Sequence, residues 1–157
     1  MASMQELEVL TNSRFYFEAD GLTDKLVLEA DGLNSETPSA GAEQVLGSTK
    51  QAVNYRQATP TQVDLTPINV KIVLTNNKDF YQWYDDCNKN SGGASSWDQN
   101  RKTASLVLYD QAASEQARWN IKNCYPNKYE GPQLDANSSD IVNETFTLVH
   151  EGVERVL

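Results

Sequence analysis

The sequence predicts a mainly β protein, a β-sandwich or split barrel with one flanking α-helix. Segments in which apolar and polar residues alternate recur along most of the chain, and a period of two is typical of half-buried strands. One segment, residues 78–87, instead has apolar residues at helical spacing. The hydrophobic fraction of 39% suits thin sheets with one wet face. A length of 157 residues fits a single domain over residues 1–157.

The first third of the chain combines two predicted strands with an arm. Residues 14–18 and 25–30 alternate in polarity, and the turn-forming sequence Asp20–Asp24 separates them. This arrangement predicts a β-hairpin. The following residues are rich in Ser, Glu, Gly and Ala and show no clean period. We therefore expect an irregular, exposed arm over residues 34–55.

The middle of the chain carries the predicted helix. Strands are expected at residues 62–65 and 69–74, which are rich in β-favouring residues. Asn77 is a good cap for a helix over residues 78–87. The helix has an apolar stripe, which is expected to pack on a sheet and which consists of Phe80, Trp83, Tyr84 and Cys87. A flexible loop rich in Gly, Ser and Asn is expected over residues 88–100.

The last third contains three further predicted strands, at residues 103–110, 117–122 and 142–150, and the last two alternate in polarity. In the last of them, one face is apolar with Val142, Phe146 and Leu148, and the opposite face is polar with Asn143, Thr145 and Thr147. Such a row of short, uncharged side chains is suited to line a wet channel.

Two prolines interrupt the region between these last two strands. Pro126 and Pro132 fix φ and lack an N–H donor. We therefore expect the chain to turn back between them rather than continue a ladder.

Composition disfavours several classes of protein. The net charge of −9 disfavours nucleic-acid binding, and only Arg101-Lys102 is locally basic. No apolar run approaches the roughly 20 residues of a membrane-spanning helix. The first eight residues lack the basic and apolar parts of a signal peptide. We expect a soluble protein made in a cytoplasm, with no direct membrane insertion.

Catalytic and metal-binding patterns are nearly missing from the sequence. His150 is the sole histidine, and no glycine-rich phosphate loop occurs. Cys87 and Cys124 lack metal-ligand spacing and are expected to be buried thiols. The acidic pairs Asp85-Asp86 and Glu130 with Asp135 could serve a glycosidase, but any acidic protein offers such pairs. We expect no enzyme, no cofactor and no metal.

The order of motifs along the chain resembles the tail tube proteins of contractile phages and the Hcp-like inner tube proteins of contractile injection systems. The resemblance begins with Gly32-Leu33 and Phe80-x-x-Trp83. Its most specific part is C-terminal and comprises Trp119, Tyr125-Pro126, Tyr129-Glu130-Gly131-Pro132 and the segment from Glu144 to Gly152. The family's Lys-Arg-Gly turn before the helix is replaced here by residues 70–75.

The resemblance implies a ring-forming structural subunit. Six copies would form a hexameric ring whose inner sheets join into a barrel around a lumen, and rings would stack into a tube. Sheath and baseplate proteins of the same particle would be partners, and cargo, either DNA or protein, would pass through the lumen. Assembly would take place in a bacterial cytoplasm. The particle could be a phage tail or an injection system, and the chain could be its main tube subunit or a baseplate initiator.

Residues for these roles follow from the matched motifs and from the predicted faces. The residues expected at subunit contacts are Glu36, Tyr55, Arg56, Tyr129, Glu130, Gly131, Pro132, His150 and Glu151. The residues expected to face the lumen are Asn143, Thr145 and Thr147. An alternative is a monomeric carbohydrate-binding β-sandwich with Trp83, Trp97 or Trp119 as a stacking platform.

Overall fold

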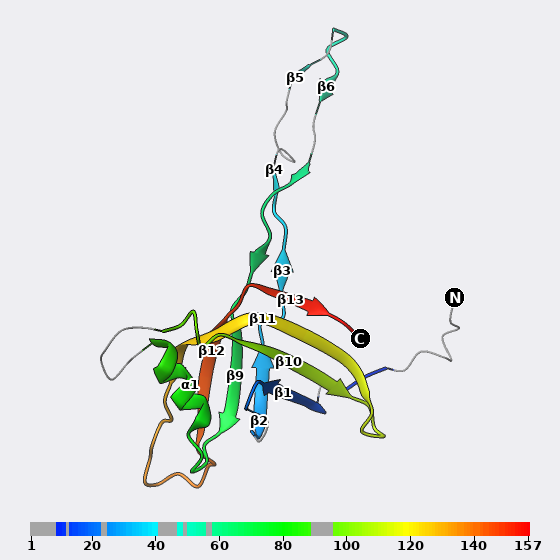
Figure 1. Ribbon diagram of the computed structural model, residues 1–157. Helices are drawn as coiled ribbons and strands as arrows, with labels where there is room; N and C mark the ends of the chain where they lie inside the picture. The colour runs from blue at the N-terminus through cyan, green and yellow to red at the C-terminus, as the bar shows by residue number, and fades with distance from the viewer. Residues whose placement is uncertain are drawn as a thin grey trace. The chain divides into compact units, whose positions relative to one another are not determined.

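A computed structural model describes residues 9–11, 13–22, 25–40, 47–48, 50–55, 58–88 and 96–157. The chain divides into two compact units, one comprising Met1–Gly32 with Pro67–Leu157 and the other Leu33–Thr66. The first unit contains one helix among its described residues and is mainly β, as predicted (Figure 1). In the described part of the chain, no helix has both the length and the apolar character needed to cross a membrane.

A seven-stranded antiparallel sheet forms the first unit. Its strand order is β1-β10-β11-β12-β9-β2, and β13 also pairs with β11. The bounds are β1 Phe15–Ala19, β2 Val27–Asp31, β9 Ile68–Val73, β10 Lys102–Tyr109, β11 Glu115–Glu130, β12 Asn143–Val149 and β13 Gly152–Arg155. The long strand β11 pairs first with β10 and β13, and then, from Tyr125 onward, with β12. The sheet is thus an open split barrel whose two halves share β11.

The core lies between the sheet and helix α1 (Asp79–Asn88). Phe80 of the helix stacks on Phe146 of β12 with ring centroids 4.1 Å apart, and on Phe17 of β1 at 6.0 Å. All three rings are essentially fully buried. The Asn77 side-chain oxygen accepts a hydrogen bond from the Asp79 N–H at 3.0 Å, which confirms the predicted cap.

The predicted hairpin of the first two strands was wrong. The turn does form, because Gly21 has a φ of +77° and the Leu22 N–H donates to the Ala19 carbonyl at 2.8 Å. However, β1 pairs with β10 and β2 pairs with β9, at opposite ends of the strand order. Turn chemistry is local, whereas the choice of partner depends on long-range burial of side chains such as Phe17.

The predicted reversal between the two prolines was also wrong. Strand β11 continues through Pro126, which lies opposite Leu148, and ends at Glu130. The register shifts between Pro126 and Lys128, and such an irregularity is where a strand tolerates the missing proline donor. The Pro126 carbonyl in turn accepts a hydrogen bond from the Asn88 side chain at 2.7 Å.

The second unit, Leu33–Thr66, is hereafter called the arm. It consists of three successive antiparallel pairs, namely β3 (Ser35–Glu36) with β8 (Asp64–Leu65), β4 (Ser39–Ala40) with β7 (Thr59–Pro60), and β5 (Gly47–Ser48) with β6 (Asn54–Tyr55). The arm therefore extends past the expected 34–55 to include a returning limb that ends in β8. None of its residues with a described side chain is buried. Of the loop expected over 88–100, residues 89–95 lie outside the described residues.

Candidate functional site

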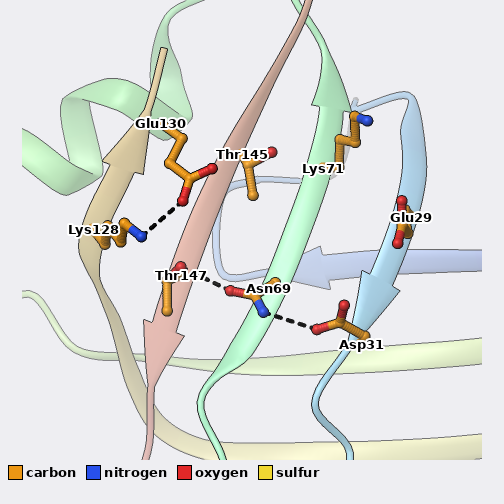
Figure 2. Close-up of a pocket in the computed structure, with 8 residues that line it drawn as sticks. All are labelled: Glu29, Asp31, Asn69, Lys71, Lys128, Glu130, Thr145 and Thr147. Carbon is orange, nitrogen blue, oxygen red and sulfur yellow. Dashed lines mark hydrogen bonds and ion pairs between the residues drawn. The ribbon is translucent and has the colours of Figure 1, made fainter. Parts of the chain in front are cut away.

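The candidate site is the polar face of one half of the split barrel. Four adjacent strands contribute to it, namely β2, β9, β12 and the last part of β11. Alternation along β9 and β12 directs Val70, Phe146 and Leu148 into the core. The opposite side is a shallow hollow of about 370 Å³ (Figure 2), here called the polar face and lined by Glu29, Asp31, Asn69, Lys71, Lys128, Glu130, Thr145 and Thr147.

Hydrogen bonds connect side chains across three strands of the polar face. The Thr147 hydroxyl donates to the Asn69 side-chain oxygen at 2.8 Å, and the Asn69 amide nitrogen donates to Asp31 at 2.9 Å (Figure 2). Lys128 and Glu130 form an ion pair at 2.8 Å. An exposed pair of this kind contributes at most about 1 kcal/mol to stability. These contacts therefore hold the side chains in place more than they stabilise the fold.

The polar face is almost neutral although the chain is acidic. It presents three carboxylates and two ammonium groups, for a net charge of −1, whereas the whole chain carries −9. Most of the acidic excess therefore lies elsewhere. The surface is hydrated and offers both hydrogen-bond donors and acceptors, without an apolar patch among its lining residues.

The three residues expected to face the lumen lie along β12. Thr145 and Thr147 line the polar face, and Asn143 begins the strand with the same alternation. The charged residues of the polar face and Asn69 were not predicted to face the lumen, because they come from strands far apart in the chain. The register of β9 and β2 places Lys71 opposite Glu29 and Asn69 opposite Asp31. The alternation of Asn69 and Lys71 with buried neighbours was the signal available in the sequence.

Tyr129, expected at a subunit contact, makes its described contacts within the chain. Its hydroxyl donates a hydrogen bond at 2.9 Å to Glu144, whose side chain is buried. Its ring packs edge-on against Tyr81, with centroids 5.1 Å apart. Burial raises the pKa of the Tyr129 hydroxyl to about 12, and the hydrogen bond to Glu144 acts in the same direction. Tyr129 thus anchors the helix side of β11.

Glu151 connects the segments around the point where β11 changes partners. Its carboxylate accepts hydrogen bonds from Arg101 at 2.5 Å and from Asn123 at 2.7 Å. Its N–H donates to the Lys122 carbonyl at 2.9 Å. Asn123 has a positive φ of +48°, which Asn tolerates better than most residues. The Glu151 contacts therefore secure a bend in the long strand.

The remaining predicted contact residues are distributed over both units. Glu130 and Gly131 are exposed and Pro132 is partly exposed at the end of β11, while His150 is partly buried after β12. Glu36 is exposed in β3, and the backbone of Tyr55 belongs to β6. Arg56 lies outside the described residues.

The two cysteine thiols, Cys87 and Cys124, have low chemical reactivity. Burial raises the pKa of the Cys87 thiol to about 11 and that of the Cys124 thiol to about 12. Both cysteines are therefore protonated at neutral pH and unreactive. In the described ranges, no three His, Cys, Asp or Glu residues are grouped so that they could hold a metal ion.

Residues 11–154 match the family described as T4-like virus tail tube protein gp19. The chain belongs to this family. The family is one of structural tail tube proteins and not of enzymes, so the match favours a tube subunit over the carbohydrate-binding alternative. Of the three tryptophans of that alternative, Trp83 is buried and donates to the Asn100 carbonyl at 2.7 Å. Trp83 is therefore not available as a stacking platform.

Solved structures of tube proteins share the fold. The chain is similar to one from the cryo-EM structure of an extracellular contractile injection system, PVC sheath-tube complex in extended state, with 17% identity, 99% of each chain covered and a TM-score of 0.74. A chain of the anti-feeding prophage cap gives 19% identity, 99% coverage of each chain and a TM-score of 0.72. Hcp1 from Flavobacterium johnsoniae is 15% identical, with 90% of this chain and 94% of that chain covered and a TM-score of 0.57. No curated protein sequence matches the chain.

Proposed function

We propose that this protein is the inner tube subunit of a contractile phage tail or contractile injection system, and that six copies form a ring with the polar face toward the lumen. The observation that carries the proposal is the polar face itself, a continuous hydrated surface over four adjacent strands of a tail tube fold. In the proposed ring, Thr145 and Thr147 of β12 belong to this lining, and Asn143 continues it at the start of the strand. Cargo, DNA or protein, then passes a surface of low net charge.

Open sheet edges support ring formation. Strand β2 ends the strand order, and the ladder between β10 and β11 stops at Cys124, so that among the described residues no strand pairs with the β10 side of β11 beyond Cys124. Unpaired strand edges favour pairing with another chain. A head-to-tail contact between the two edges, repeated six times, closes into a ring. The exposed end of β11 at Glu130, Gly131 and Pro132 is then close to the neighbouring subunit.

The other proposed partners are copies in adjacent rings and the other proteins of the particle. The arm, with Glu36, Tyr55 and Arg56, reaches an adjacent ring, and Tyr129, His150 and Glu151 support the surfaces between subunits. Sheath and baseplate proteins bind the finished tube, a proposal supported by fold matches to chains of a sheath-tube complex and of a baseplate. The subunit assembles in the bacterial cytoplasm and becomes part of a phage or injection particle without inserting into a membrane.

Negative-stain electron microscopy over a range of concentrations, with sedimentation velocity on the same sample, tests the assembly. We expect rings or stacked tubes of uniform width. A protein that stays monomeric at high concentration would contradict the proposal.

The lumen assignment needs a separate test. Thr147→Cys in assembled rings is labelled with a maleimide gold cluster, and we expect density inside the ring. Lys122→Cys, which replaces a side chain that is 62% exposed on β11, is the control and should carry its label elsewhere. The buried native cysteines will not react.

A further inference from the structure

We propose that the loop between β11 and β12 is the docking site for the arm of a copy in the adjacent ring, with Val53 of that arm seated against Leu134 and Ile141. The inference rests on the proposed function, because it requires stacked rings. It adds to that function a receiving surface and a defined pair of contacts.

The receiving surface is a hollow in the loop over residues 131–142. It has a volume of about 730 Å³ and is lined by Gln133, Leu134, Asp135, Ala136, Ser138, Asp140, Ile141, Val142 and Asn143. Leu134 is 77% exposed and Ile141 is 74% exposed. Two large apolar side chains exposed in one hollow indicate a binding surface.

Further apolar side chains continue this surface across the end of the sheet. The Leu74 N–H donates to the Val142 carbonyl at 3.0 Å, and the Val73 N–H donates to the Leu26 carbonyl at 3.0 Å. Leu26 is 66% exposed and Leu74 is 39% exposed. Leu26 just before β2, Leu74 just after β9 and the loop residue Val142 therefore lie side by side at one end of the strands.

The arm begins at the other end of the same strands. Strand β9 (Ile68–Val73) begins directly after Pro67, where the arm returns, and is followed by Leu74 beside the hollow. Gly32 lies at this root, where a larger residue would not fit, because its φ is +93° and an added Cβ would lie 2.2 Å from the Pro67 carbonyl oxygen. When rings stack head to tail, one end of a subunit meets the opposite end of the next. In such a stack, the root of the arm in one subunit faces the receiving surface of the next.

The arm has the reach and the chemistry to occupy the hollow. Its first limb, Leu33 to Ser48, can extend to roughly 50 Å at about 3.3 Å per residue, against roughly 23 Å for β12. Val53, near the tip, is 58% exposed and has no core of its own to enter. Lys50, in the same tip, is exposed and complements Asp135 and Asp140 at the hollow.

Cross-linking between two single-cysteine proteins tests the contact. Val53→Cys and Ile141→Cys, carrying tags of different size, are mixed, assembled and oxidised with copper phenanthroline. We expect a covalent heterodimer at least tenfold more abundant than in the matched mixture of Val53→Cys with Lys122→Cys. The native thiols are buried and will not compete. In parallel, Ile141→Asp should leave rings intact and shorten or abolish tubes.

The outcomes separate this inference from the proposed function. Rings and tubes that form normally, without preferential cross-linking to Ile141→Cys or with full-length tubes of Ile141→Asp, would overturn the docking site and leave the tube function standing. A wild-type protein that forms no rings would overturn both.

Discussion

The sheet unit and the arm differ in what holds them together. The sheet unit buries three phenylalanine rings against each other and a set of aliphatic side chains behind them. The arm buries no described side chain, and its three strand pairs have only two residues in each strand. Burial of apolar surface is the main stabilising contribution in folding. We therefore expect the sheet unit to be stable by itself and, under the proposed stacking, the arm to gain its contacts from other copies.

The largest effect is expected in the aromatic core. Phe80→Ala removes a ring that is 1% exposed and stacked on Phe146 and Phe17, so we expect the free energy of unfolding to fall by about 3–5 kcal/mol. Val53→Ala in the arm is the matched control and should change it by less than about 0.5 kcal/mol. Urea denaturation followed by tryptophan fluorescence measures both. Equal losses for the two variants would contradict the comparison.

A smaller effect is expected at the polar contact under the helix. Tyr129→Phe leaves the buried Glu144 carboxylate without its Tyr129 donor, so we expect a loss of about 1–3 kcal/mol at pH 8. The folded-state pKa of Tyr129 lies near 12, above the ordinary value of 10.0. The contribution of Tyr129 is therefore complete below pH 10 and disappears as the pH rises through 12.

The stability difference between wild type and Tyr129→Phe should accordingly shrink between pH 10 and pH 12. Urea denaturation of both proteins at pH 8, 10 and 11.5 measures it. Taking the difference cancels the titration of the other tyrosines and lysines. A difference that is constant over this range would exclude the Tyr129 hydroxyl as its source.

A smaller loss of stability is expected when the helix cap is removed. Asn77→Ala removes the acceptor of the Asp79 N–H, and we expect a loss of about 1 kcal/mol. Asn76→Ala, one residue earlier and also exposed, should cost less than about 0.5 kcal/mol. Thermal unfolding followed by circular dichroism distinguishes the two variants, and an equal effect of both would show that the cap contributes nothing specific.

Local patterns in the sequence predicted the elements well, and the pairing poorly. The capped helix at Asn77 and the alternation of β12 follow from neighbouring residues, so both could be predicted. The partners of β1 and β2, and the passage of β11 through Pro126, depend on contacts between residues far apart in the chain. For the same reason Lys71 and Glu29 were not foreseen on the polar face, since only the register brings them together.

The smallest effect on folding, with a large effect on assembly, is expected for loss of the outer arm. Replacing residues 39–60 by two glycines keeps the root ladder of β3 and β8 and removes no buried side chain among the described residues. We therefore expect the free energy of unfolding to change by less than about 1 kcal/mol, while rings form and stacked tubes shorten or vanish. Urea denaturation and electron microscopy on one preparation measure both.

Full-length tubes from this variant would show that the arm is dispensable for stacking. A large loss of stability would show that the arm supports the folding of the sheet unit. The expected pattern, a stable ring that cannot stack, follows only when the sheet unit folds by itself and the arm contributes contacts to another copy.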